Sequence, residues 1–328
     1  ARAASVIISQ YGGPDGELGA SLRYLSQRFT MNQPEVAGLL TDIGTEELAH
    51  LEMIGAIVYQ LTKDLTVEQI KAGVEGGWAD VFPNKGKRSG AYSWGTYGTH
   101  PYIFMNYTNN LNDVMTLVHE MGHSMHSWYS RRNQPYATAD YCIFTAEVAS
   151  TTNEVLFLSG LLSETGDRKK RLYLLNRRLE NIRTTVYRQT MFASFEREVH
   201  KRAAEGGDTT PDGLKQLWYE LNRKYYGEAI TIDEPLKMEW ARIPHFYTPF
   251  YVYQYATGYS AATALAGAIL EQGEPATRRY LNFLTKGGSD YPIELLKGAG
   301  VDMSTPQPVE AVVRQFEKTL DEMEELAE

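Results

Sequence analysis

Residues 113–123 of this 328-residue chain read Asp113-Val114-Met115-Thr116-Leu117-Val118-His119-Glu120-Met121-Gly122-His123. The first six residues are mostly apolar and suit a helix. Residues four apart on a helix share a face, so His119 and His123 project side by side. Two imidazoles so placed can bind one Zn²⁺, and Glu120 faces the same cavity as general base for a metal-activated water. The stretch therefore predicts a helix that carries a catalytic zinc site.

A catalytic zinc takes three protein ligands and keeps one position open. The next helical pattern, residues 140–163, supplies Glu147 and Glu154, which are seven residues apart and share one face. Glu147 lies among small and apolar residues, where an unpaired carboxylate is costly, so we assign it as the third ligand. Glu154 is either a hydrogen-bond acceptor that orients a ligand histidine or a solvated surface acid.

Helical periodicity dominates the rest of the chain. It predicts helices at residues 18–29, 34–60, 66–72, 112–131, 140–163, 167–204, 210–226, 248–271, 275–285 and 308–326. Residues 73–107 differ, because they are rich in Gly and aromatic residues and contain two β-prone runs at 91–94 and 101–107. We therefore expect a mostly α fold with a small β element, divided near residue 73 into a short two-helix segment (1–73) and a larger domain (74–328).

Composition excludes several classes of protein. The net charge of −9 argues against nucleic acid bound through a basic face. A single cysteine, Cys142, excludes a disulfide scaffold or a cysteine-cluster metal site and fits a reducing compartment. The longest weakly polar run, residues 260–270, is too short to span a bilayer, and the apolar N-terminal run is too short for a signal peptide. We expect a cytoplasmic protein with no membrane or nucleic-acid partner.

Three segments strongly resemble the catalytic half of oligoendopeptidase F, of the thimet-oligopeptidase family of zinc metallopeptidases. They are residues 86–93, 119–123 and 146–154, and the resemblance extends from about residue 78 to the C-terminus. It implies a helical zincin-type fold with Zn²⁺ as cofactor and a deep channel, selective for short peptides because folded proteins cannot enter. It also implies that the strand at residues 102–107 lines the cleft and pairs with peptide backbone through a free edge.

Tyrosine is over-represented, with 22 residues against 11 Phe. Five tyrosines lie between residues 247 and 259, directly after His245. Peptide hydrolysis through a tetrahedral intermediate needs donors aimed at the developing oxyanion. By resemblance, His245 and Tyr253 match the transition-state-binding histidine and tyrosine of the family, and Tyr247 and Tyr251 are further candidates. The implied mechanism combines zinc polarisation, proton transfer by Glu120 and oxyanion stabilisation by Tyr253 and His245.

The N-terminal segment carries a different pattern. Glu47 and His50 form a Glu-x-x-His on one helix, and Glu17 opens the preceding helix; together they are half of the ligand set of a di-metal four-helix bundle. The same residues also suit a solvated acid and a packed histidine. However, residues 6–72 closely resemble the first two helices of the ferritin-like manganese catalases. That resemblance implies Glu17, Glu47 and His50 as Mn²⁺ ligands, with Tyr24 as their neighbour.

Each part lacks a portion of the family it resembles: the second helix pair of manganese catalase, and the N-terminal half of oligoendopeptidase F. Three hypotheses follow. The first is a zinc endopeptidase that acts on short peptides. The second is a manganese catalase-like redox protein whose site is completed when two N-terminal hairpins form a homodimer. The third is a non-catalytic fusion with a truncated peptidase core. Whether the chain is a natural fusion, an engineered chimera or a composite record stays open.

Overall fold

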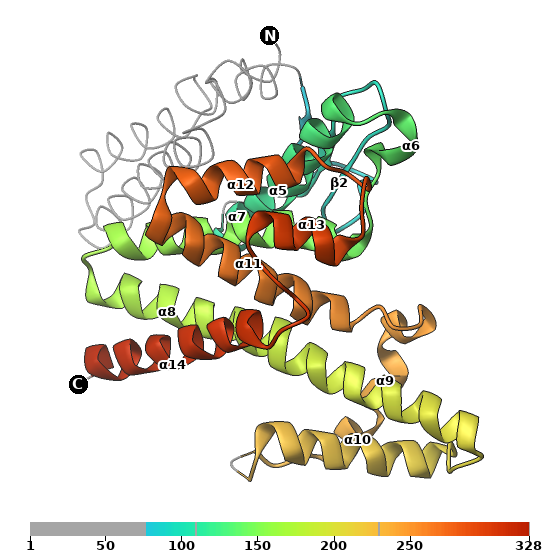
Figure 1. The fold of residues 1–328 in the computed structure, drawn as a ribbon. Helices are drawn as coiled ribbons and strands as arrows, with labels where there is room; N and C mark the ends of the chain where they lie inside the picture. Colours follow the sequence, from blue (N-terminus) through green and yellow to red (C-terminus); the bar gives the residue numbers. More distant parts are fainter. Residues whose placement is uncertain (1–76, 109, 229, 328) are drawn as a thin grey trace.

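The computed structural model describes residues 77–108, 110–228 and 230–327. Over these residues the chain is mostly helical with one small sheet, which confirms the predicted fold class (Figure 1). The long helices are α5 (Leu111–Asn133), α7 (Ile143–Glu164), α8 (Arg168–Ile182), α9 (Arg188–Glu205), α10 (Pro211–Tyr226), α11 (Tyr253–Gln272), α12 (Glu274–Leu284) and α14 (Gln307–Ala327). The shorter elements are α6 (Tyr136–Ala139), α13 (Pro292–Ala299), the π-helical η2 (Arg183–Tyr187), and the 3₁₀ segments η3 (Glu234–Arg242) and η4 (Pro244–Tyr247).

The helices predicted between residues 112 and 326 agree with the observed ones except at the start of one of them, and those predicted at 18–29, 34–60 and 66–72 lie outside the described residues. The pattern at 167–204 corresponds to α8, η2 and α9, which follow one another without a break. The helix predicted at 248–271 begins only at Tyr253, because Pro249 and the left-handed backbone of Phe250 (φ 56°) prevent a helix over residues 248–252. The eight-residue α13 was not predicted, since it is too short for a clear periodicity. The predicted boundary near residue 73 lies outside the described residues.

The sheet has the strand order β1-β3-β2, with β1 at Ala79–Asp80, β2 at Tyr92–Trp94 and β3 at Tyr102–Phe104. β3 pairs in parallel with β1 and antiparallel with β2, so it is the central strand. The expectation that residues 102–107 form a free edge for peptide is therefore wrong. The two-residue β1 and the carbonyls beside it take up that edge, and a strand so short leaves no periodicity in the sequence. β2, not β3, is the outer strand next to the site.

Helix α7 lies between α5 and α11, and glycines on both neighbours allow a close approach. A Cβ at Gly122 of α5 would lie 2.5 Å from the Cα of Ser150 and 2.9 Å from the carbonyl oxygen of Ala149. A Cβ at Gly258 of α11 would lie 3.2 Å from the Cβ of Glu147. The segment of α7 that carries Glu147 is thus held from both sides by backbone contact.

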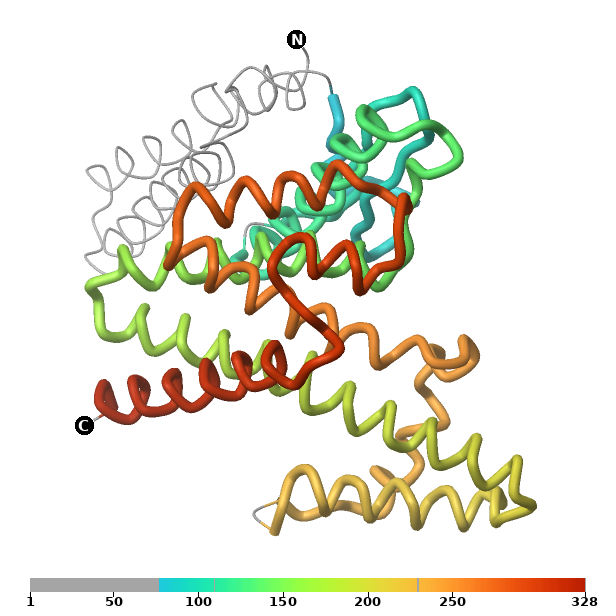
Figure 2. The backbone as a smooth tube through the Cα atoms, in the orientation of Figure 1, coloured from blue at the N-terminus to red at the C-terminus, as the bar shows by residue number. Residues whose placement is uncertain are grey.

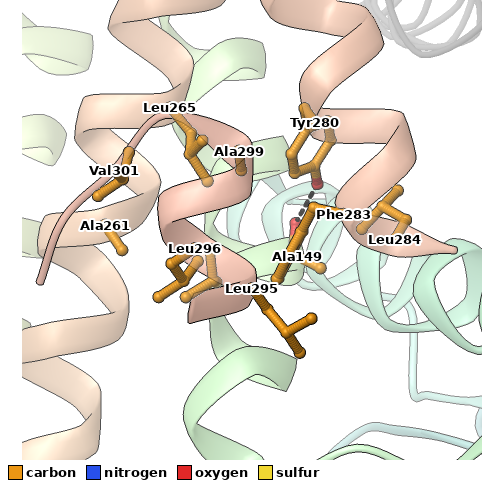
Figure 3. Close-up of a cluster of buried hydrophobic side chains, with 11 residues drawn as sticks. Ala149, Ala261, Leu265, Tyr280, Phe283, Leu284, Leu295, Leu296, Ala299 and Val301 are labelled. Atoms are coloured by element: carbon orange, nitrogen blue, oxygen red, sulfur yellow. Dashed lines mark hydrogen bonds between the residues drawn. The ribbon is translucent and has the colours of Figure 1, made fainter. Parts of the chain in front are cut away.

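A large apolar cluster joins α7 and α11 to α12 and α13 (Figure 3). Its buried members are Val148, Ala149, Ala261, Leu265, Tyr280, Phe283, Leu284, Leu295, Leu296, Ala299 and Val301. The Tyr280 hydroxyl donates a hydrogen bond to the carbonyl oxygen of Ala149, at 3.2 Å, so the one polar group of the cluster is satisfied. The cluster fixes α7 from the side of α12 and α13.

Two helix pairs extend from this centre. α8 runs beside α14, and the antiparallel α9 and α10 form an arm (Figure 2). An aromatic cluster holds the arm together, with Trp218 fully buried between Phe192 and Phe195. No helix in the part of the chain that the structure describes combines the length and apolar composition needed to span a membrane.

Candidate metal centre

Three of the predicted ligands meet where α5 and α7 cross. The Nε2 atoms of His119 and His123 are 3.1 Å apart. The carboxylate of Glu147 lies 3.6 Å from Nε2 of His119 and 3.9 Å from Nε2 of His123. The helical spacing places the two histidines on one face, and the close contact of α5 with α7 supplies the carboxylate from a different helix.

Glu154 lies seven residues, or about two helical turns, beyond Glu147 and contacts His119 as well. Its Oε1 is 2.5 Å from Nδ1 of His119, and its side chain is only 23% exposed. Of the two sequence interpretations of Glu154, the orienting acceptor matches this geometry and the solvated acid does not. With Nδ1 of His119 committed to this carboxylate, Nε2 is the ring nitrogen that faces His123 and Glu147.

Glu120 is buried beside the three predicted ligands, at 6% exposure. The backbone N–H of Ser93, in β2, donates a hydrogen bond to its carboxylate, which connects the outer strand directly to the site. Burial raises the pKa of Glu120 to about 7, against the opposing charge of His119. A carboxyl group with a pKa near neutrality can both accept and return a proton at physiological pH.

The two histidines have opposite protonation tendencies. Burial disfavours the charged form of His119, but its hydrogen bond to Glu154 and the surrounding carboxylates outweigh this and raise its pKa to about 9. Burial and the charge of His119 lower the pKa of His123 to about 3. The site thus already concentrates one positive charge among three carboxylates, which is the electrostatic environment that suits a cation.

A cavity of about 280 Å³ opens beside His119. Its walls come from α5, α7, α11 and the junction of α8 with η2, and its lining residues are His119, Glu147, Thr151, Glu154, Asn181, Thr185, Tyr255 and Tyr259. Sequence reasoning did not select five of these: Thr151, Asn181, Thr185, Tyr255 and Tyr259. The i, i+4 spacing of the two tyrosines was a usable signal for one shared helix face. The π-helical turn that carries Thr185 left no comparable signal in the sequence.

The predicted transition-state residues divide into two groups. The ring of His245 lies 5.7 Å from that of Tyr251 and 6.0 Å from that of Tyr255, and Tyr251 forms a hydrogen bond with Tyr255. His245 and Tyr251 therefore connect to the cavity through Tyr255. Tyr253 and Tyr247 do not line the cavity and are 41% and 86% exposed. The proposed N-terminal ligands Glu17, Glu47 and His50, with Tyr24, lie outside the described residues.

Known proteins resemble most of the chain. The oligopeptidase PepF of Bacillus subtilis is 58% identical over 257 residues, which is 78% of this chain and 38% of that protein. The chromosomal oligoendopeptidase F of Lactococcus lactis subsp. cremoris is 46% identical, over 80% of this chain and 43% of that protein. The solved structure of oligoendopeptidase-F from Enterococcus faecium is 44% identical with a TM-score of 0.59, and the match covers 66% of this chain and 40% of that one. The chain thus spans about two fifths of the length of the curated relatives it matches.

Two family models match the chain. The model for manganese containing catalase matches residues 1–81, which confirms the resemblance of the N-terminal segment. The model for peptidase family M3 matches residues 58–315, well over half of the chain. The oligoendopeptidase F resemblance is confirmed with it, and the chain belongs to peptidase family M3.

Proposed function

We propose that this chain is a zinc-dependent endopeptidase that hydrolyses short oligopeptides. The observation that carries the proposal is the convergence of His119, His123 and Glu147, whose donor atoms all lie within 4.8 Å of one another, with the buried Glu120 beside them. Membership of peptidase family M3 and the oligopeptidase names of its relatives support it. The manganese-dependent alternative concerns a different part of the chain.

The donor set fits a zinc ion. Two ligands of a tetrahedral zinc at zinc–nitrogen distances of about 2.0–2.1 Å lie about 3.3 Å apart, and the separations of 3.1, 3.6 and 3.9 Å surround that value. Two imidazoles with one carboxylate are a ligand set typical of catalytic zinc, and Glu154 supplies the outer carboxylate that such a histidine usually contacts. When bound, zinc would supply a Lewis acid that polarises a carbonyl and acidifies water.

The chain's own residues supply the proton transfer and the oxyanion donors. Glu120 accepts a proton from the attacking water and delivers it to the leaving amine, and the Ser93 N–H holds its carboxylate in place. Burial raises the pKa of Tyr255 well above its usual range, so its phenol stays protonated and can donate to the oxyanion. We assign Tyr251 and His245 to support Tyr255, because both contact its ring.

Short peptides are the proposed substrates, and we infer that their backbone pairs with β2. This strand is the outer one beside Glu120, and an extended peptide can add to an outer strand of a sheet. The one cysteine, Cys142, is a free thiol, in keeping with the proposed cytoplasmic location.

A quenched fluorogenic peptide tests the activity. Glu120→Gln is expected to lower kcat at least about 100-fold while one zinc per chain is retained, because it removes only the proton acceptor. Glu147→Ala is expected to lose the zinc, and 1,10-phenanthroline to abolish hydrolysis by the unaltered chain. Glu198→Gln, on α9, whose carboxylate pairs with Arg202 of the same helix, serves as a control. Hydrolysis that survives Glu120→Gln would sink the proposal.

A comparison of two tyrosines tests the oxyanion assignment. Tyr255→Phe is expected to lower kcat by about 10²–10³, the size typical of a lost oxyanion donor, while Tyr253→Phe has the smaller effect because Tyr253 lies outside the cavity lining. The reverse order would return the role to Tyr253, as the family resemblance implies.

A second candidate function belongs to the N-terminal segment, because residues 1–81 match the manganese catalase model. We propose that Glu17, Glu47 and His50 form a Mn²⁺ half-site completed in a homodimer. Metal analysis would then find two manganese ions per dimer, and His50→Ala would abolish peroxide disproportionation. Absence of manganese after loading, measured by mass spectrometry, refutes this function without affecting the first.

A further inference from the structure

The connection between η4 and α11 contains a strained backbone. Phe250 has φ 56°, and no other residue except glycine has a positive φ in the described parts of the chain. The left-handed region is unfavourable for a bulky side chain, so it persists only where surrounding contacts hold it. The Phe250 side chain is half-exposed and does not itself provide that hold.

A buried carboxylate on α9 holds this residue. Oε1 of Glu196 accepts a hydrogen bond from the backbone N–H of Phe250 at 2.7 Å. Glu196 is 4% exposed, and no cationic nitrogen of the described residues lies within ion-pair distance of its carboxylate. A buried carboxylate without a cation is unfavourable unless hydrogen bonds compensate it. The bond to Phe250 is therefore the contact that accounts for an acid at this position.

Apolar contacts seat the same segment on α9 but do not set its turn. Val252 is 1% exposed and packs in one cluster with Phe192 and Phe195 of α9. The exposed His200, one turn after Glu196, places its ring 4.9 Å from that of Phe250. Such contacts are non-directional and tolerate rotation of the backbone, whereas a hydrogen bond to a carboxylate fixes the direction of one N–H.

The direction of the chain at Phe250 determines where the next side chain lies. Tyr251 contacts the ring of His245 and forms a hydrogen bond with Tyr255, which lines the cavity with His119 and Glu147. We propose that Glu196 is a positioning residue: its carboxylate holds residues 248–252 in the left-handed turn that presents Tyr251, and with it Tyr255 and His245, to the cavity. This inference rests on the proposed peptidase function.

Two conservative variants separate the hydrogen bond from the charge. Glu196→Gln keeps an acceptor oxygen at the same length, so kcat should stay within about threefold of the unaltered chain. Glu196→Asp keeps the charge but is one methylene too short, so kcat should fall about 10- to 100-fold as Tyr255 loses its alignment, with KM within about threefold. Glu198→Asp, two residues along α9 and paired with Arg202 at its surface, is the matched control and should behave as the unaltered chain.

Amide hydrogen exchange gives a readout independent of activity. Peptides covering residues 247–252 should exchange faster in Glu196→Asp than in Glu196→Gln or Glu198→Asp. Should Glu196→Asp not fold, Glu196→Met, which keeps the side-chain length without an acceptor, takes its place with the same expectation. A solely structural role would lower the melting temperature but leave kcat of the folded enzyme unchanged.

The outcomes distinguish this inference from the proposed function. If the unaltered chain hydrolyses peptide in a chelator-sensitive way and Glu196→Asp retains its kcat, the positioning role is refuted. A loss of kcat in Glu196→Gln as large as that in Glu196→Asp also refutes it, because an acceptor oxygen at the full side-chain length would then not be sufficient to hold the turn. If the unaltered chain shows no such hydrolysis, the proposed function fails. Separately, if amide exchange over residues 247–252 is unchanged in Glu196→Asp, the hydrogen bond from Glu196 does not hold Phe250 in its turn.

Discussion

Gly122→Ala adds one methyl group between the helices that carry the proposed metal ligands. The new Cβ would lie 2.5 Å from the Cα of Ser150 and 2.9 Å from the carbonyl oxygen of Ala149, both backbone atoms of α7. Ordinary contact begins at 3.4 Å, so α7 must move away from α5 by about 0.9 Å at this point. Glu147 lies on the part of α7 that would move, whereas His119 and His123 stay on α5.

The expected magnitude follows from that displacement. Overpacking of this kind costs about 1–3 kcal/mol, and the better helix propensity of Ala returns about 0.5–1 kcal/mol, which leaves a net destabilisation of about 1–2 kcal/mol. Metal sites tolerate ligand displacements of only about 0.2 Å. Separating Glu147 from the two histidines should therefore weaken zinc binding by about 10–100-fold, the range typical for loss of a residue that orients a metal ligand.

Competition with a chromophoric chelator measures the zinc affinity, and urea unfolding of the metal-free chain measures the stability. Gly267→Ala in α11 is the matched control, because a Cβ there meets no atom within 4 Å. It should stabilise the chain by about 0.5–1 kcal/mol and leave the zinc affinity unchanged. If Gly122→Ala behaves like Gly267→Ala in both assays, the contact between α5 and α7 does not set the ligand geometry.

Three further variants test neighbouring contacts. Glu154→Gln removes the charged partner at 2.5 Å from Nδ1 of His119 and should weaken zinc binding about 10–100-fold in the chelator assay; an unchanged affinity would exclude the orienting role. His126 is buried, which lowers its pKa from 6.5 to about 3, so between these values the unfolded chain binds more protons and stability is lost as pH falls below 6.5. Between pH 7 and pH 5, the free energy of unfolding in urea should therefore fall by about 2 kcal/mol less for His126→Phe than for the unaltered chain. An equal fall in both chains would contradict this. Tyr280→Phe removes the hydrogen bond to the Ala149 carbonyl and should lower the free energy of unfolding by about 1 kcal/mol without changing kcat. A fall in kcat would show that this core contact influences the site.

Local patterns predicted much of the helical architecture. Periodicity identified α5, α7, α10, α12 and α14 with small errors at their ends, because an amphipathic repeat is a property of neighbouring residues. The errors occurred where tertiary contacts determine the backbone. The left-handed turn at Phe250 depends on Glu196 of α9, and the short β1 exists through its pairing with β3.

The sequence by itself predicted the proposed metal-binding set, which is two histidines on one helix and an acid on the next. Spacing on a single helix places His119 beside His123, and an acid in an apolar stretch marks Glu147 as a group that needs a counter-charge. Only the tertiary structure decided which tyrosines line the cavity, that β3 is a central strand, and how closely α7 approaches α5. Those features depend on contacts between residues far apart in the chain, such as Gly122 with Ser150, and no local spacing records them.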